Sequence, residues 1–270
     1  MTAPGTTETV TVRVGPARLR VRTTGSGPPL LLCMGIGGNL DMWEPLLAHL
    51  PDRRLITFDF PGTGGSSLSP LPPTMAANAF LVRALLRRLE VDRADVLGYS
   101  WGGVLAQHLA FQHPSVVRRL VLAATTVGLG GVPPSPVTAA HLLTPRRYYS
   151  RRYFREVAPS LYGGRHRRDP AIVEAHATRR LGKPPSPVGY AAQLAAVTGY
   201  STLPGLRRIS APTLVLAGGD DPIVPAANAR LMARMIRRST LRVLPDAGHL
   251  LLVDSPEVVG PIIEGFLAGA

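Results

Sequence analysis

The stretch Asp95-Val96-Leu97-Gly98-Tyr99-Ser100-Trp101-Gly102-Gly103 decides the fold. A short apolar run with the character of a strand ends at Gly98, and a run with helical spacing begins directly after Ser100. This order predicts a sharp strand-to-helix turn that holds the serine hydroxyl above a sheet, with small residues at 98 and 102 permitting the tight turn. A Gly-x-Ser-x-Gly pattern is a weak signal by itself, so the strand before it and the helix after it carry the inference.

Apolar runs of strand length alternate with helical patterns on both sides of this turn, which is typical of a parallel sheet covered by helices on both faces. The first two predicted strands alternate with polar residues and are joined by Gly15-Pro16, so we expect an antiparallel hairpin at the sheet edge. The predicted fold class is therefore α/β, with a mostly parallel eight-stranded sheet flanked by helices. Strands are expected over residues 10–14, 19–23, 30–34, 55–60, 95–98, 120–124, 213–217 and 241–244, and helices over 74–89, 101–113 and 256–267.

The alternation of strand and helix stops after Ala124. Proline and glycine are frequent in the stretch that follows, and six of the chain's thirteen tyrosines and phenylalanines lie between Tyr148 and Tyr190. We expect a mostly helical cap over residues 125–204, called the cap segment below. It would be inserted into a core formed by residues 1–124 and 205–270.

Two further residues complete a candidate catalytic set. Serine is a poor nucleophile without a neighbouring base, and His249 has the best setting for that role, directly after the last predicted strand. Asp221 follows the seventh predicted strand, at a carboxyl end, where sites of open α/β sheets assemble, and is expected to orient the histidine. Asp220 remains an alternative. Asp221 is favoured because the following Pro222 fixes the backbone, and the chain order serine, acid, histidine fits the strand-turn-helix motif.

Acyl transfer also needs two amide donors where negative charge develops on the substrate oxygen. The N–H of Trp101, directly after the serine, is one candidate. The other is the N–H of Ile36, in the glycine-rich loop Met34-Gly35-Ile36-Gly37-Gly38-Asn39. A phosphate site in this loop is disfavoured because the third glycine of a dinucleotide fingerprint is missing and no Gly-Lys-Ser/Thr follows.

The remaining titratable candidates are expected to be structural. Asp59 ends the fourth predicted strand and precedes the serine in sequence, so it is interpreted as part of the turn that borders the site. The histidines that lie in the cap segment keep a substrate or surface role as an open alternative. Outside the cap segment lie His49, His108 and His113, and within it lie His141, His166 and His176.

The net charge of +13 is concentrated in the cap segment, because Arg146 to Lys183 holds eleven basic residues and three acidic ones. Such a lid could attract an anionic partner, such as a phospholipid-coated granule surface, through a salt-sensitive field. A solvated arginine-rich surface is an equal alternative. Nucleic acid is disfavoured because no recognition motif accompanies the charge.

The single cysteine, Cys33, lies in an apolar run and excludes an intrachain disulfide and any multi-cysteine metal site. The stretch Met1-Thr2-Ala3-Pro4-Gly5 lacks the features of a signal peptide, and no apolar run is long enough for a transmembrane segment, so a cytoplasmic location is expected. The predicted chemistry needs neither a metal nor an organic cofactor.

These motifs together resemble the α/β-hydrolase superfamily over essentially the whole chain. A narrower set of motifs comprises Met34–Leu40, Ser100–Gly103, Leu122–Thr125, Pro145–Tyr148, Tyr162–Gly164, Arg168–Pro170 and Gly219–Pro222. This set resembles the intracellular poly(3-hydroxyalkanoate) depolymerases. That resemblance implies hydrolysis of polyester or its oligomers through an acyl-serine intermediate at the surface of storage granules. Tyr99 departs from the expected small or β-branched residue, which predicts a different acyl pocket.

Two other functions fit the same residues. A small-molecule carboxylesterase, thioesterase, lactonase or carbon-carbon bond hydrolase would keep the serine, histidine and aspartate and change the substrate, because this fold hosts many chemistries. A binding protein on a hydrolase scaffold without turnover is disfavoured because all the catalytic positions are filled.

Overall fold

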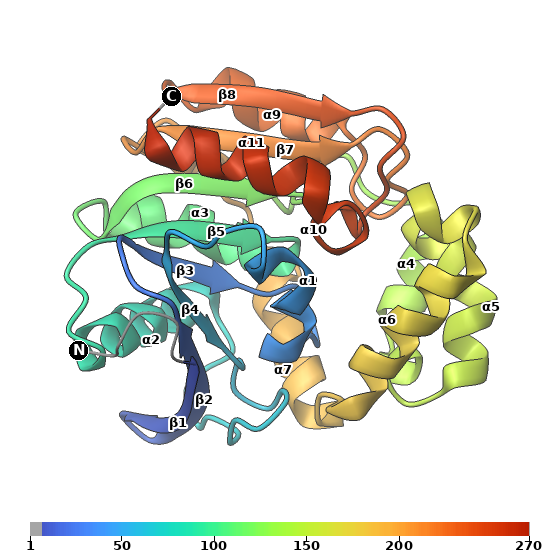
Figure 1. Ribbon diagram of the computed structural model, residues 1–270, viewed down its shortest axis with the longest axis horizontal. Coiled ribbons are helices and arrows are strands. Elements are labelled where there is room, and N and C mark those ends of the chain that lie inside the picture. The colour runs from blue at the N-terminus through green and yellow to red at the C-terminus, as the bar shows by residue number, and fades with distance from the viewer. Residues whose placement is uncertain (1–6, 270) are drawn as a thin grey trace.

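The computed structural model describes residues 7–269, so the Met1–Gly5 stretch that bears on a signal peptide lies outside the described residues. Eight strands form a sheet in the order β1-β2-β4-β3-β5-β6-β7-β8 (Figure 1). The strands are β1 (Thr7–Val14), β2 (Ala17–Thr24), β3 (Pro29–Cys33), β4 (Arg54–Phe58), β5 (Ala94–Tyr99), β6 (Val117–Ala123), β7 (Thr213–Gly218) and β8 (Ser239–Leu244).

The strand pairing confirms the mostly parallel sheet and the antiparallel edge hairpin. Strand β1 pairs with β2 in antiparallel register, with Val14 opposite Ala17, and β2 pairs antiparallel with β4. The other five pairings are parallel. Predicted strand ends coincide with the observed ones at Val14, Thr213 and Leu244 and differ by one to three residues elsewhere. Met34 and Phe60 were expected inside strands but lie just beyond them. Their side chains are buried, so the apolar run in the sequence continues past the last paired residue of each strand.

Successive residues of a strand point to opposite faces of the sheet, and helices cover both of these faces. Leu31 and Cys33 pack toward α2, α3 and α9, whereas Leu30 and Leu32 pack toward α1, α10 and α11. Cys33 is fully buried, as expected for a core residue. These helices are α2 (Met75–Arg88), α3 (Trp101–Gln112) and α9 (Ala227–Met235) on one face, and η1 (Leu40–Trp43), α1 (Glu44–Leu47), α10 (Leu251–Asp254) and α11 (Pro256–Ala268) on the other.

The cap segment folds into helices and also contains an isolated β-bridge between Gly128 and Ser201. Four of its helical elements begin at a Ser-Pro, Thr-Pro or Asp-Pro pair, in which the polar side chain accepts a backbone N–H and proline takes the first helical position. The elements are α4 (Pro136–Leu142), η2 (Pro145–Tyr148), α5 (Arg151–Tyr162), η3 (Gly164–Arg167), α6 (Pro170–Gly182), α7 (Pro187–Val197) and α8 (Leu203–Leu206). Helix α8 crosses residue 204, where the cap was expected to end, and the chain returns to the sheet at Thr213, where the seventh strand was predicted to begin.

The cap segment lies beyond the carboxyl ends of the parallel strands. Figure 1 shows α4, α5 and α6 grouped past the arrowheads of the sheet. Helix α7 contacts the loop after β3, because Gln193 accepts the N–H of Gly37. The described residues form two apolar cores, one on each face of the sheet. One of them continues from the sheet into α5 through Phe154, Val157 and Leu161. None of the helices between residues 7 and 269 is both long enough and apolar enough to cross a membrane.

Candidate active site

Ser100 lies at the strained turn between β5 and α3. Its backbone has φ 54° and ψ −119°, a conformation that residues other than glycine rarely adopt. The turn leaves no room beside it: a Cβ on Gly102 would lie 2.1 Å from the carbonyl oxygen of Cys33, and one on Gly98 would lie 2.6 Å from the Cβ of Ala106. The prediction that small residues permit this turn is therefore confirmed by the close approach of the neighbouring strand and helix.

Ser100, His249 and Asp221 form one hydrogen-bond chain. The Nε2 atom of His249 lies 3.0 Å from Ser100 Oγ, and its Nδ1 atom lies 2.8 Å from Asp221 Oδ2. The other carboxylate oxygen, Oδ1, accepts the backbone N–H groups of Ile223 and Val224 at 2.8 and 2.9 Å. Both carboxylate oxygens are thus engaged, so the orientation of the carboxylate toward the imidazole is fixed.

Asp220, the alternative acid, points elsewhere. Its Oδ2 atom accepts the backbone N–H of Gly164 at 2.7 Å, and Oδ1 lies 3.1 Å from the guanidinium of Arg167. The structure therefore places Asp221 against His249, and places Asp220 at the junction between the cap segment and the loop after β7.

This junction is built from backbone atoms in close contact. Gly163 and Gly164 have φ values of 63° and 54°. A Cβ on Gly163 would lie 2.0 Å from the carbonyl oxygen of Asp220, and one on Gly164 would lie 2.2 Å from the amide of Gly248. The end of α5 thus rests directly on the two loops that carry Asp221 and His249.

The two amide groups expected to face the reacting oxygen, those of Ile36 and Trp101, have no hydrogen-bond acceptor among the described residues. Trp101 is the first residue of α3, where the helix presents unpaired N–H groups and a partial positive charge. The loop around Ile36 is fixed on its other side, because Gly37 N–H donates to Gln193 Oε1 at 2.7 Å and the Tyr148 hydroxyl donates to the Ile36 carbonyl. Two donors are thus left available next to Ser100.

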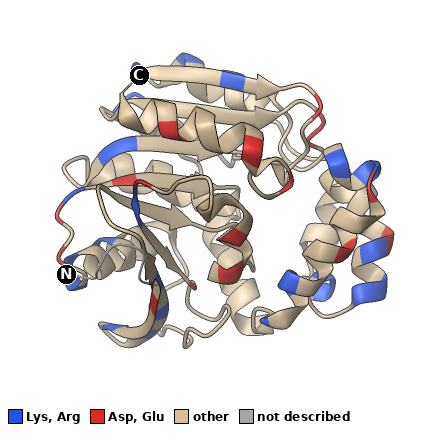
Figure 2. Ribbon diagram, viewed as in Figure 1, with Lys and Arg blue, Asp and Glu red and all other residues tan. Residues whose placement is uncertain are grey.

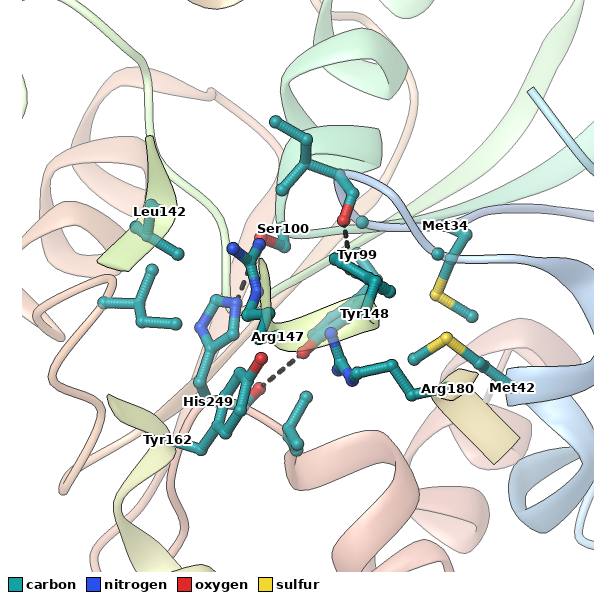
Figure 3. A pocket seen from close by; sticks show the side chains of 15 residues that line it. Met34, Met42, Tyr99, Ser100, Leu142, Arg147, Tyr148, Tyr162, Arg180 and His249 are labelled. Carbon is teal, nitrogen blue, oxygen red and sulfur yellow. Dashed lines mark hydrogen bonds between the residues drawn. The ribbon is translucent and has the colours of Figure 1, made fainter. Parts of the chain in front are cut away.

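A cavity of about 80 Å³ opens above Ser100 and His249 (Figure 3). Its walls come from the sheet-bearing part of the chain and from the cap segment. One group of lining side chains is apolar: Met34, Ile36, Met42, Leu142, Ile223 and Leu250. Another is aromatic or cationic: Tyr99, Tyr148, Tyr162, Arg147 and Arg180. An amphiphilic ligand would find both an apolar wall and positive charge beside the serine.

The family model described as alpha/beta hydrolase fold matches residues 28–256. The chain belongs to the alpha/beta hydrolase family.

Proteins of similar sequence and structure narrow the class of reaction expected of this hydrolase. It is 42% identical to a poly(3-hydroxyalkanoate) depolymerase from Ectopseudomonas oleovorans over 242 residues, which cover 88% of this chain and 84% of the relative. It is 30% identical over 256 residues to 3-oxoadipate enol-lactonase 2 from Acinetobacter baylyi, covering 89% and 88% of the two chains. A crystal structure of a hydrolase from Pseudomonas aeruginosa PA01 superposes with a TM-score of 0.81 at 31% identity, covering 98% of this chain and 99% of the other. Together these comparisons support an ester hydrolase activity.

The hydrolase holds His249 with two aromatic residues that no sequence motif marks for this role. The hydroxyl of Tyr99 donates to the carbonyl oxygen of His249 at 3.2 Å, and the ring of Tyr162 stacks on the imidazole with an interplanar angle of 22°. Burial raises the pKa of Tyr99 well above its usual value, with the Asp221 carboxylate adding to the shift, so the hydroxyl remains a donor. Tyr99 stands where a small or β-branched residue was expected, and its hydroxyl supports the backbone of His249.

Two histidines of the cap segment have neither a surface role nor contact with the cavity. His166 and His176 are buried, and with Asp254 of α10 they form a hydrogen-bond chain. His166 Nδ1 lies 2.9 Å from Asp254 Oδ2, and its Nε2 lies 2.8 Å from His176 Nδ1. The potential ligand atoms of the three side chains lie within 4.8 Å of one another, close enough for one metal ion. Both ring nitrogens of His166, however, form hydrogen bonds with Asp254 and His176. The arrangement links the cap segment to α10.

Asp59 is structural, as interpreted from its position. Its side chain is fully buried and accepts the N–H groups of Leu40 and Gly65 at 2.6 and 2.7 Å, with Arg20 at 3.3 Å. It therefore fastens the turn after β4 to the start of η1.

Figure 2 shows Lys and Arg gathered along the helices of the cap segment, and their side chains are divided between the surface and the interior. Arg151 pairs with Glu174 on the surface, and Arg167 pairs with Asp220. Arg147 and Arg180, in contrast, are 2% and 3% exposed. These two residues are therefore not part of a solvated arginine-rich surface, one of the two alternatives expected from the sequence.

Proposed function

We propose that this hydrolase cleaves carboxylic esters through an acyl-serine intermediate, with Ser100 as nucleophile, His249 as general base and acid, and Asp221 as the orienting carboxylate. The observation that carries the proposal is the hydrogen-bond chain from Asp221 through His249 to Ser100 Oγ at the wall of the cavity. Nucleophile, base and orienting group lie within the distances that such catalysis requires.

The first half-reaction forms the acyl-enzyme. Ser100 Oγ attacks the ester carbonyl carbon while His249 Nε2 takes the hydroxyl proton. The negative charge that develops on the carbonyl oxygen would be stabilised by the N–H groups of Ile36 and Trp101, each donor of this kind being worth about 10²–10³ in kcat. Collapse of the tetrahedral intermediate breaks the bond to the alcohol oxygen, which receives the proton from His249.

The second half-reaction releases the acid. A water molecule gives a proton to His249 and attacks the acyl carbon, and the new tetrahedral intermediate returns Ser100 Oγ as the leaving group. Asp221 accepts the Nδ1 hydrogen bond throughout and stabilises the imidazolium, so it needs no change of protonation state.

We propose poly(3-hydroxyalkanoate) polyester or its oligomers as the substrate. The identity to the relative of that name supports this substrate, as does the apolar wall formed by Met34, Met42 and Leu250, which suits an alkyl side chain. The cap segment would then form the substrate lid, since it supplies Leu142, Tyr148 and Tyr162 to the cavity.

Two measurements test the proposal. Ser100→Ala should lower kcat on a nitrophenyl ester by several orders of magnitude while leaving the thermal unfolding curve in place, because it removes the reacting oxygen and no packed group. A fluorophosphonate probe should label the wild-type chain and not this variant. Comparable activity of the variant would refute the role of Ser100, and turnover of thioesters or lactones in preference to a polyester emulsion would refute the substrate.

A further inference from the structure

We propose that Arg147 and Arg180 form a carboxylate-binding subsite next to Ser100. The hydrolase would then act on the acid end of a hydroxyacyl oligoester, where the leaving group itself carries a free carboxylate. The inference rests on the proposed ester hydrolysis and adds to it which ester bond of the chain is cut.

The two guanidinium groups reach the same cavity from different helical elements. Arg147 belongs to η2 and Arg180 to the last turn of α6, and both line the cavity together with Ser100 and His249 (Figure 3). Arginine stays protonated under all ordinary conditions, so the cavity holds two positive charges.

Neither charge has a counter-ion within the described residues. The surface arginines Arg151 and Arg167 are paired with carboxylates, but no Asp or Glu of residues 7–269 forms an ion pair with Arg147 or Arg180. Burying an unpaired ion costs several kcal/mol. An anionic ligand would offset most of this cost in a protein that keeps two such ions in its active-site cavity.

The aromatic side chains around them compensate for only part of the lost hydration. The guanidinium of Arg180 lies over the rings of Tyr148 and Tyr162, with its Cζ 4.6 and 5.2 Å from the ring centroids, and that of Arg147 lies 5.0 Å from Tyr148 and 5.4 Å from Tyr190. Ring faces attract the cation but accept few of its N–H groups. They orient the planar guanidinium and leave its edge for a ligand.

Unused N–H donors remain on both side chains. Nη1 of Arg147 donates to the carbonyl oxygens of His141 and Thr144 at 3.1 Å, which fixes the side chain. The buried Nε atoms of Arg147 and Arg180 have no partner within the described part of the chain. A guanidinium edge with free donors matches the two oxygens of a carboxylate, and such charge-assisted pairs are about twice as strong as neutral hydrogen bonds.

The acid end of a hydroxyacyl chain fits this combination of groups. Attack by Ser100 on the terminal ester bond forms a bond from Oγ to the acyl carbon and breaks the bond to the alkoxy oxygen. His249 protonates that oxygen, and a hydroxy acid leaves with its carboxylate on the arginines. Its alkyl side chain can contact Met42 and Leu250, the apolar part of the same wall.

The experiment compares one ester bond with and without the adjacent charge. The substrates are the linear dimer of a medium-chain 3-hydroxy acid as the free acid and as its methyl ester, at a pH of about 7.5, where the acid is ionised. We expect kcat/KM for the acid to exceed that for the methyl ester by about tenfold or more, as a charged hydrogen bond predicts. The free hydroxy acid should likewise inhibit hydrolysis of a neutral nitrophenyl ester at a concentration about tenfold lower than its methyl ester does.

One variant and a matched control test the role of the arginines in this preference. Arg180→Met keeps the length and apolar bulk of the side chain, and it should lower the acid-to-methyl-ester ratio severalfold, since Arg147 keeps the second positive charge of the cavity. Arg152→Gln removes an exposed arginine of α5, so the ratio should stay at the wild-type value. If Arg180→Met fails to fold, inhibition of the wild-type enzyme by the free hydroxy acid and by its methyl ester still tests the carboxylate subsite.

The outcomes separate this inference from the proposed function. Absence of turnover on both dimers and on the nitrophenyl ester would overturn the ester hydrolase proposal. Equal turnover of both dimers, with equal inhibition by acid and methyl ester, would overturn the carboxylate subsite alone and leave the arginines as packing elements of the cap segment.

Discussion

The backbone N–H of His249 donates to the carbonyl oxygen of Tyr162 at 2.8 Å, so the candidate general base is held by the cap segment. The Tyr162 ring also stacks on the imidazole. Proton transfer by His249 therefore depends on how α5 is seated, although α5 is far from His249 in sequence.

Removal of the Tyr162 ring should affect both stability and catalysis. Tyr162→Ala leaves a cavity beside His249, and we expect a loss of about 3–5 kcal/mol in the free energy of unfolding, with a fall in kcat of about tenfold. Tyr162→Phe is the matched variant. It deletes a buried hydroxyl that has no hydrogen-bond partner among residues 7–269, so the free energy of unfolding should change by less than about 1 kcal/mol. Urea unfolding followed by fluorescence distinguishes the two, and an equal effect of both would contradict the stacking role.

The adjacent aspartates allow a controlled test of the orienting carboxylate. Asp221→Asn keeps the shape of the side chain but favours the wrong imidazole tautomer, so kcat should fall by about 10⁴-fold. Asp220→Asn retains an amide oxygen that can accept the Gly164 N–H and weakens only the partly exposed pair with Arg167, so kcat should stay within about threefold. Steady-state kinetics on one nitrophenyl ester measure both. A larger loss for Asp220→Asn would show that the acid has been assigned to the wrong residue.

The close packing behind Ser100 predicts a severe effect of a single methyl group. Gly102→Ala would place Cβ against the backbone of Cys33, which cannot move without displacing β3, so we expect little folded, active protein. Gly182→Ala serves as the comparison, since no atom lies within 4 Å of its Cβ position. That variant should be as stable as the wild type or slightly more stable. Circular dichroism and thermal unfolding of the purified variants check this, and a stable, active Gly102→Ala would contradict it.

Stability should decline as the pH falls below about 6.5, and His176 should contribute to this decline. Burial holds the pKa of His176 well below its usual value, and repulsion from His166, Arg180 and Arg179 adds to the shift, despite the Asp254 carboxylate at 3.5 Å. The unfolded chain takes up a proton below about pH 6.5 while the folded chain does not, so folding stability is lost as the pH decreases.

The loss attributable to His176 at a pH of about 5.5 should approach about 1.4 kcal/mol, the value of one pH unit. His108 and His113 are shifted in the same direction by burial, so the wild type should lose more than this. Urea unfolding at pH values of about 7.5 and about 5.5 should show a smaller decrease for His176→Gln than for the wild type. Equal decreases would mean that His176 is protonated in the folded state.

Local sequence signals were sufficient for the sheet and for the position of Ser100. Strand-length apolar runs identify the central strands, because a parallel sheet buries both faces of its strands, whereas polar alternation identifies the antiparallel hairpin of β1 and β2. The order of serine, acid and histidine placed Asp221 and His249 at strand ends that this topology brings together. The ends of the strands were misjudged by a few residues, as with Met34, because burial continues past the last hydrogen-bonded pair.

The interior of the cap segment could not be derived in the same way. An arginine near the end of a helix, such as Arg180, has the same local pattern whether it faces solvent or a cavity. Its burial is decided by Tyr148 and Tyr162, which approach from other helical elements. The pairing of His166 with Asp254 likewise joins segments far apart in the sequence, and no periodicity encodes such a contact.

The glycine junction at Gly163 and Gly164 divides the cap segment into a constrained part and a freer part. Backbone packs on backbone there, so a mutation that shifts this end of α5 would also shift His249 and Asp221. Helix α4 contributes Leu142 to the cavity without such a junction, whereas η2 is tied to the Ile36 loop through the Tyr148 hydroxyl. Among related hydrolases, changes of substrate range should therefore be found in α4, while the sequence around the two glycines stays the same.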